Sequence, residues 1–123
     1  MIDQEFSQVV AIVEAFCKIL AVLIPKVQQG TANPKEQEAY GQAVAGLSAY
    51  RDQMAGAIVE KWDRYGYLTQ IPARIPGGGP AIIPVLESLR DLARFQILNN
   101  PAGRPIWEPR LQQIEWDMRR FQQ

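Results

Sequence analysis

The sequence predicts an all-α fold: a bundle of about four helices with a long Pro/Gly-rich loop between the second and third. Apolar residues recur at alternating steps of three and four over most of the chain, which is the period of amphipathic helices. Asn, Gly and Pro fall where these stretches begin and end. A chain of 123 residues with 47% hydrophobic residues suits one domain. We expect a single helical domain over residues 1–123, with helices at about 3–29, 34–65, 81–98 and 106–122.

The first predicted helix is apolar around most of its surface. Ile12 and Ile19 widen one side of its main apolar seam, which consists of Phe6, Val9, Val13, Phe16, Leu20, Leu23 and Val27. A polar strip remains, on which Glu14 and Lys18 are spaced for an i,i+4 ion pair. Such a helix needs cover on most sides, so either it is the central helix or a neighbouring subunit covers it. Pro25 should end or kink it.

A membrane span is not expected from this helix. The longest apolar run, Val9–Ile24, is shorter than the roughly 20 residues that cross a bilayer. Glu14 and Lys18 lie in its middle, and each charge costs about 2.5–3.5 kcal/mol at a bilayer centre. The acidic start of the chain also differs from a secretory signal. We therefore expect a soluble protein without a membrane partner.

The second predicted helix has the clearest start. Asn33 suits the N-cap, Pro34 the first helical position and Glu36 the third position, as in a capping box. Gly66 supplies the end. The apolar face between them carries Tyr40, Val44, Leu47, Met54, Ile58, Trp62 and Tyr65. This pattern predicts a long, slim scaffold helix.

Residues 66–83 are predicted to form an extended loop. Prolines recur at every fourth position around a run of three glycines, and both residue types disfavour a regular helix or strand. The loop is either a surface linker or an extended arm whose isoleucines occupy a groove of a partner. The candidate partner-binding residues of this arm are Ile71, Ile75, Ile82 and Ile83. A phosphate-binding loop is disfavoured because no Lys-Ser/Thr pair follows the glycines.

The C-terminal residues 100–123 are predicted to include a docking segment. Their helix has a narrow apolar seam, formed by Trp107, Leu111, Ile114, Met118 and Phe121. Trp116 lies off this seam and should be exposed. The arginine guanidinium binds a carboxylate through two parallel hydrogen bonds and also stacks on aromatic rings. Both properties suit protein interfaces. The candidate partner-binding residues here are Trp107, Arg110, Trp116, Arg119 and Arg120.

The composition argues against catalysis and against a cofactor. The chain contains no histidine and one cysteine, Cys17, which should be a buried structural thiol. Glu87 and Asp91 stand four residues apart, and a solvated acidic face is the expected role of this pair. Lys plus Arg and Asp plus Glu both number 13, so no net charge attracts nucleic acid. We expect no enzyme activity, no metal, no cofactor and no small-molecule substrate.

Part of the chain resembles the head-to-tail adaptor proteins of tailed bacteriophages. The stretch that begins Asn33-Pro34-Lys35-Glu36, continues through Ala39, Leu47 and Trp62 and ends Gly66-Tyr67-Leu68 is similar to the first long helix of that family. The run Ile83-Pro84-Val85-Leu86-Glu87-Ser88-Leu89-Arg90-Asp91-Leu92-Ala93 is similar to its later helix, which a proline introduces. The similarity covers roughly residues 33–98, with a Pro/Gly loop in place of the family's usual β-rich insertion. It implies a ring of identical subunits below the portal, whose C-terminal segments reach a neighbouring ring.

These observations favour a non-enzymatic assembly subunit that acts through protein–protein contacts. The leading hypothesis is a ring-forming component of a phage neck or tail, whose partners are copies of itself and other structural proteins. An alternative is a small dimeric helical binding module, such as a chaperone or regulator, and an enzyme that uses carboxylates alone is less favoured. The expected location is the virion if the chain derives from a phage, and otherwise the cytoplasm.

Overall fold

The all-α prediction is confirmed over the residues that the computed structural model describes, 4–65 and 70–122. Their elements are α1 (Gln4–Gln29), α2 (Pro34–Tyr65), α3 (Gln70–Arg74), the 3₁₀ turn η1 (Gly79–Ile82), α4 (Ile83–Asn99), the 3₁₀ turn η2 (Pro101–Gly103) and α5 (Arg104–Gln122). The four long helices agree closely with the predicted ranges. The short helix α3 is an addition to them.

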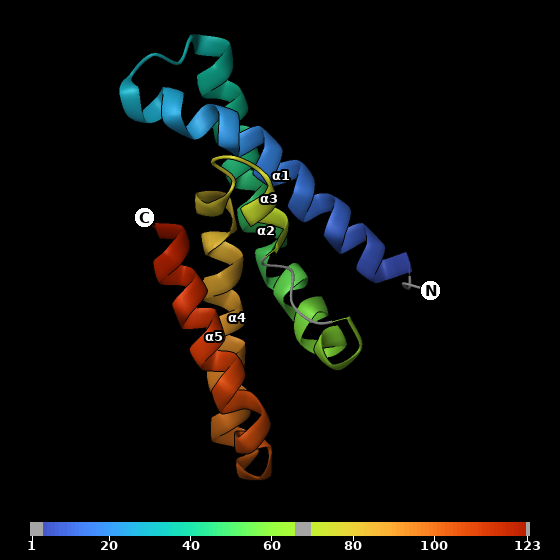
Figure 1. Cartoon of the computed structure of the whole chain (residues 1–123). Coiled ribbons are helices and arrows are strands. Elements are labelled where there is room, and N and C mark those ends of the chain that lie inside the picture. Colours follow the sequence, from blue (N-terminus) through green and yellow to red (C-terminus); the bar gives the residue numbers. More distant parts are fainter. Residues whose placement is uncertain (1–3, 66–69, 123) are drawn as a thin grey trace.

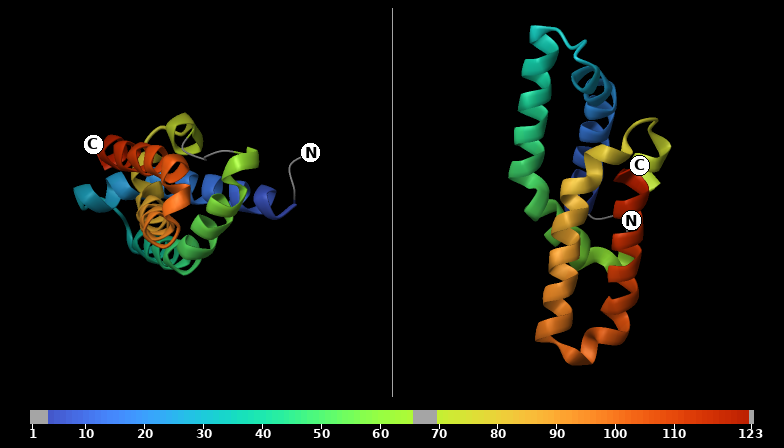
Figure 2. Two further views of the ribbon diagram at one scale, coloured as in Figure 1. Left: turned by 90° about the horizontal axis from the view of Figure 1, so that it is seen from below. Right: turned by 90° about the vertical axis from the view of Figure 1, so that its left-hand side faces the viewer.

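Two helical hairpins make up the fold (Figure 1). The antiparallel helices α1 and α2 form one hairpin, α4 and α5 form the other, and α2 packs on α4 to join them (Figure 2). Within the described ranges α1 contacts α2, α3 and η1 and makes no close backbone approach to α4 or α5. The central helix is therefore α4 rather than α1. Of the two alternatives for covering α1, the one that made it the central helix of its own chain is wrong.

The core lies where the two hairpins meet, around the middle of α2 and α4. One side of α4 contributes Val85, Leu86, Leu89 and Ala93, all at most 1% exposed. They pack with Met54 and Ile58 of α2 and Ile114 of α5 in one hydrophobic cluster. The apolar steps of three and four in each helix produce these buried stripes.

The start of α2 forms the predicted capping box. The backbone N–H of Glu36 donates to Oδ1 of Asn33 at 2.8 Å, and the Asn33 N–H donates to Oε1 of Glu36 at 3.1 Å. Lys26, in the last turn of α1, forms an ion pair with Glu36 across the connection. Hydrogen bonds from the Lys26 side chain and from the Asn33 backbone lower the pKa of Glu36.

Pro25 does not end α1, which continues to Gln29. A proline removes a single hydrogen bond of the helix, and the exposed ring of Pro25 meets solvent. The turn beyond it is held by the Lys26–Glu36 ion pair and by a hydrogen bond from Thr31 N–H to the Lys26 carbonyl at 2.9 Å.

The extended loop predicted for residues 66–83 is not confirmed where it is described, because residues 70–74 and 79–82 are helical. Pro72 lies in the first turn of α3, and Pro80 and Pro84 lie at the first or second position of η1 and α4. The first backbone N–H groups of a helix have no partner within it, so proline loses nothing at such positions. Three of the four regularly spaced prolines therefore mark helix starts, whereas Pro76 lies in the turn between α3 and η1.

The glycines of this segment allow a tight turn and a close contact. Gly77 has φ of +78°, which favours glycine. A Cβ atom on Gly79 would lie 2.7 Å from Cδ1 of Phe121, so the missing side chain lets the end of α5 pack on η1. Residues 70–82 thus fold against the body of the protein.

Candidate interaction surface

The four isoleucines predicted to form an arm belong to the fold of their own chain. Ile71 is 6% exposed and Ile82 is 4% exposed, and both lie in the core. Ile75 and Ile83 are partly buried and pack against it. The extended arm predicted for these residues is not confirmed, because all four isoleucines pack in or against the core of their own chain.

Trp107 and Arg110 form an internal clamp between α5 and the end of α2. The guanidinium of Arg110 lies 5.2 Å from the ring centroid of Trp62 and 4.8 Å from that of Trp107. The two rings meet edge to face at 6.2 Å, and Arg110 also pairs with Asp63. The Arg110 side chain is only 16% exposed. These contacts satisfy both residues within the chain, which leaves little of them for a partner.

Trp116, Arg119 and Arg120 are exposed on α5. Trp116 is 55% exposed, as its position off the apolar seam predicts. The Arg120 guanidinium lies 5.0 Å from the Trp116 ring centroid, and its Nη2 atom is 3.1 Å from Oδ1 of the buried Asp117. Asp117 thus fixes Arg120 beside the indole, and the pair presents a flat aromatic and cationic surface.

A larger apolar surface lies along α1, and we call it the α1 face. It consists of Ile12, Ala15, Phe16, Ile19 and Val22, which repeat at helical spacing, together with Tyr50 of α2. Ile19 is 45% exposed, Val22 58% and Tyr50 48%. The tip of the Phe16 ring lies 3.1 Å from the place of a Cβ on Gly46, so the missing side chain of this glycine makes room for the ring against α2. Within the described residues, nothing else covers the α1 face.

The length and composition of α1 also meet the requirement for a membrane-spanning helix. Core helices of soluble proteins meet the same requirement, and α1 buries Phe6, Val9, Val13, Cys17, Leu20 and Leu23 against the rest of the chain. Its polar strip carries the predicted pair, with Lys18 Nζ 3.2 Å from Glu14 Oε1.

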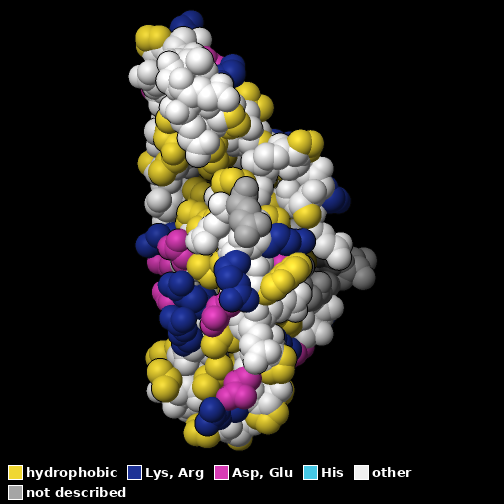
Figure 3. All heavy atoms as spheres, turned by 60° about the vertical axis from the view of Figure 1, so that its left-hand side comes forward, with side chains coloured by type: hydrophobic (Ala, Val, Ile, Leu, Met, Phe, Trp, Pro, Cys, Tyr) yellow, Lys and Arg dark blue, Asp and Glu magenta, His cyan; other side chains and the backbone are white. Residues whose placement is uncertain are grey.

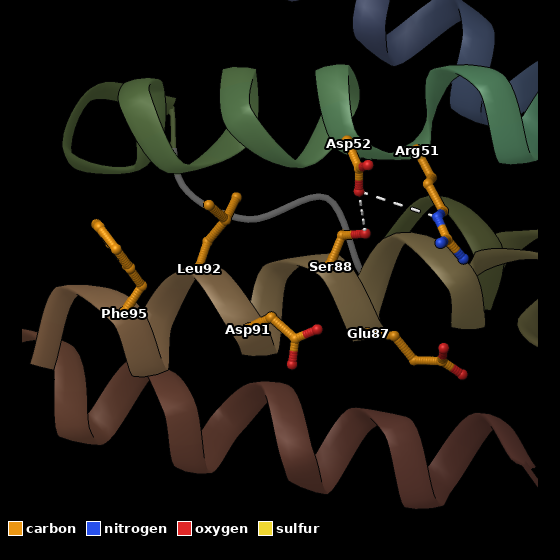
Figure 4. Close-up of a pocket in the computed structure, with 7 residues that line it drawn as sticks. All are labelled: Arg51, Asp52, Glu87, Ser88, Asp91, Leu92 and Phe95. Carbon is orange, nitrogen blue, oxygen red and sulfur yellow. Dashed lines mark hydrogen bonds and ion pairs between the residues drawn. The ribbon is translucent and has the colours of Figure 1, made fainter. Parts of the chain in front are cut away.

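The acidic residues of α4 border a cavity between α2 and α4 of about 480 Å³ (Figure 4). The Ser88 hydroxyl donates to Oδ1 of Asp52 at 2.8 Å, while Glu87 and Asp91 project from α4. On the other side of α4, Arg90 and Arg94 border a groove toward α5. No three described His, Cys, Asp or Glu side chains lie close enough to hold a metal ion.

Cys17 is buried, as predicted, at 1% exposure. Burial, and secondarily the charge of Glu14, raises the pKa of its thiol to about 11. Because the thiolate is the reactive form, Cys17 offers no nucleophile near neutral pH.

Sequence reasoning missed several exposed apolar residues. Phe95 is 60% exposed, Leu98 80% and Ile106 55%, and all lie near the free end of the α4–α5 hairpin. The exposure of Phe95 and Leu98 could have been predicted from the sequence, because both fall on the opposite side of α4 from its buried stripe. Tyr50 was not predictable in this way, since its role depends on how α1 lies on α2.

Comparisons of this chain with protein families, with curated proteins and with solved structures found no match.

Proposed function

We propose that this chain is a non-enzymatic structural subunit that assembles with copies of itself and with other structural proteins, as a ring component of a phage neck or tail. The observation that carries this proposal is the uncovered α1 face, where Ile19, Val22 and Tyr50 remain about half exposed on a helix that is apolar around most of its surface.

The energetic argument concerns what covering this face would contribute. Fully burying one large apolar side chain contributes about 1.5–3 kcal/mol, so covering these three half-exposed side chains contributes roughly 1 kcal/mol each. The net stability of a whole domain is only about 5–15 kcal/mol. A subunit contact on the α1 face would therefore contribute a free energy that is substantial relative to the folding stability of this small protein.

The ring and the phage context rest on the sequence resemblance over roughly residues 33–98. In that family the C-terminal segment reaches a neighbouring ring, and Trp116, Arg119 and Arg120 are the residues of this chain available for such docking. The described part of the Pro/Gly-rich stretch, residues 70–83, which we call the proline-containing segment, stands where the family has its β-rich insertion. Contacts that the insertion makes would therefore be replaced here by other surfaces.

A small dimeric helical binding module is the second candidate. It is favoured by the form of the α1 face, which is one continuous patch on one hairpin. A single patch of this kind can be covered by the same patch of a second copy around a two-fold axis. Assembly size distinguishes the two candidates, because a ring has many subunits.

The test is sedimentation velocity across a concentration series, with negative-stain images of the largest species. The variant is Ile19→Glu, which places a charge in the middle of the α1 face, and the matched control is Ser7→Glu, which adds the same charge on the exposed polar side of α1. We expect the wild type and Ser7→Glu to form rings and Ile19→Glu to dissociate.

Three other outcomes assign the face differently. A defined dimer that only Ile19→Glu disrupts would support the binding module. Flotation of the wild type with lipid vesicles, abolished by Ile19→Glu, would assign the α1 face to a membrane. Equal sedimentation of Ile19→Glu and the wild type would remove the α1 face from any interface and contradict the proposal.

A further inference from the structure

We infer that the outer side of α4 is a second self-association surface, on which two copies of this chain pair with their α4 helices parallel about a two-fold axis. This surface, which we call the α4 face, consists of Glu87, Arg90, Asp91, Arg94, Phe95 and Leu98. The inference rests on the proposed function, since it identifies one of the contacts between copies. The α4 face differs from the α1 face because it lies on the other hairpin and carries charged as well as apolar side chains.

The α4 face lies opposite the buried stripe of the same helix. Residues 85, 86, 89 and 93 face the core, so the helical period places 87, 91, 94, 95 and 98 on the outer side. Asp91, Arg94, Phe95 and Leu98 are exposed there, while Glu87 and Arg90 are partly exposed. The central helix of the fold thus also presents an outer surface.

Charges on this surface are sorted into two rows along the helix. Glu87 and Asp91 border the cavity toward α2, which Arg51 and Asp52 of α2 line on its other side, and Figure 4 shows the Glu87 and Asp91 carboxylates projecting from α4 away from α2. Arg90 and Arg94 border the groove toward α5, where Arg119 adds a third guanidinium and Glu115 of α5 contributes one carboxylate. Figure 3 shows positive and negative side chains close together at mid-height on this side of the molecule.

This sorting is complementary to itself in one orientation. A half-turn about an axis that runs parallel to α4 and along its surface exchanges left and right, so the acidic row of one copy lies over the basic row of the other. A half-turn about an axis across α4 would instead place like rows on each other. Complementary potentials fix the register of interfaces, so the charge pattern favours parallel helices.

Contacts inside the chain leave these groups available. The Arg90 Nε to Asp91 Oδ1 distance is 3.4 Å, and the Arg94 Nη2 to Glu115 Oε1 distance is 3.9 Å. Both distances exceed that of a close charge-assisted hydrogen bond, and a guanidinium has five donors. Each arginine can therefore reach a carboxylate of a second copy without losing an essential internal partner.

Phe95 and Leu98 supply the apolar part of the contact. They are 60% and 80% exposed, and Phe95 lies one turn beyond Asp91 and Leu98 one turn beyond Arg94 on the outer side of α4. In the parallel pair Leu98 meets its own counterpart near the axis, whereas Phe95, which borders the cavity toward α2 beside the acidic row, packs against the flank of the other copy's helix. Exposed ion pairs alone hold proteins together only weakly, so these two side chains are needed as the anchor.

The first experiment exchanges the charges. One double variant is Glu87→Arg with Asp91→Arg, and the other is Arg90→Glu with Arg94→Glu; circular dichroism verifies that each remains folded. In sedimentation velocity, we expect each variant alone to lose self-association at least tenfold. An equimolar mixture should recover it, because an all-basic face then meets an all-acidic one. A mixture that associates no better than its components overturns the inference.

The second experiment does not depend on charge. Leu98→Cys places a thiol near the axis on an 80% exposed position, and the buried Cys17 does not compete. Under mild oxidation, we expect Leu98→Cys to form disulfide-linked dimers at least ten times faster than Gln42→Cys, which lies on an exposed part of α2. Equal rates for the two variants overturn the parallel arrangement.

The α1 face serves as the reference for both experiments. If Ile19→Glu disrupts the assembly while the charge variants and Leu98→Cys behave as the wild type and control, the α4 inference fails and the proposed function stands. If the charge exchange works while Ile19→Glu has no effect, the α4 pairing stands and the role of the α1 face fails.

Discussion

Replacing Ile82 with alanine tests whether the proline-containing segment is part of the folded core. Ile82 lies in η1, is 4% exposed and belongs to the main hydrophobic cluster. Truncation of a buried isoleucine to alanine costs about 2–5 kcal/mol, from lost transfer energy and the cavity left behind. We therefore expect Ile82→Ala to lower the free energy of unfolding by about 3 kcal/mol.

The corresponding change in melting temperature follows from chain length. An unfolding entropy of about 2.1 cal/mol/K per residue gives roughly 260 cal/mol/K for 123 residues, so each 1 kcal/mol shifts Tm by about 4 °C. Ile82→Ala should thus melt about 12 °C below the wild type in circular dichroism at 222 nm. The matched control is Arg74→Ala, an exposed position of the same segment, which should stay within about 0.5 kcal/mol.

A loss below about 0.5 kcal/mol for Ile82→Ala would refute this reasoning. It would mean that the isoleucine contributes nothing to its own subunit, as the extended-arm hypothesis requires. Both variants are compared at several protein concentrations, so that a stability change caused by altered assembly is recognised by its concentration dependence.

Three other predictions test local features of the fold. Asn33→Ala removes the capping acceptor of α2 and should lower the free energy of unfolding by about 1 kcal/mol in urea titrations, whereas no loss would show that the cap is dispensable. Gly79→Ala places a Cβ 2.7 Å from Phe121 Cδ1 and should destabilise by about 1–3 kcal/mol, whereas Gly56→Ala meets nothing within 4 Å and should stabilise by about 0.5–1 kcal/mol; calorimetric melting of both variants checks this contrast. Because burial raises the pKa of Cys17 from 9.0 to about 11, the folded state holds this proton more tightly than the unfolded chain. Stability should therefore be retained below pH 9 and fall between pH 9 and 11. Cys17→Ala should lack that part of the fall in urea midpoints, and equal pH profiles would contradict the assignment.

Helix positions were predictable because their signals are local. Asn33, Pro34 and Glu36 act within one turn, and the structure forms the box that they predict. The apolar seam of α5 similarly placed Ile114 and Phe121 inside and Trp116 outside. Such inferences need only the period of a helix and the chemistry of its first turn.

The proline-containing segment was mispredicted because proline has two meanings that local sequence does not separate. It excludes the interior of a helix and favours the first turn, and here Pro80 and Pro84 occupy first turns. In the fold Phe121 packs over Gly79, a contact between residues far apart in the sequence that no local pattern specifies. Composition alone did not distinguish a loop from a series of helix starts, and that distinction depends on tertiary packing.

The candidate surfaces also include features that the sequence predicts and features that depend on tertiary packing. The excess apolar surface of α1 follows from its sequence, and Ile19 and Val22 are indeed exposed. That Arg110 is occupied by Trp62 and Trp107 does not follow, because the partners come from separate helices. A residue type suited to an interface is equally suited to a contact within the chain.

The division into two hairpins bears on how the polypeptide reaches its native state. In each hairpin the partners follow one another along the chain, so the entropy lost in closing the connection is small, and proteins rich in such short-range pairings fold within microseconds to milliseconds. Docking of α2 on α4 spans the proline-containing segment and closes the longer loop. We expect that docking to limit the folding rate, with each hairpin gaining helical structure before it.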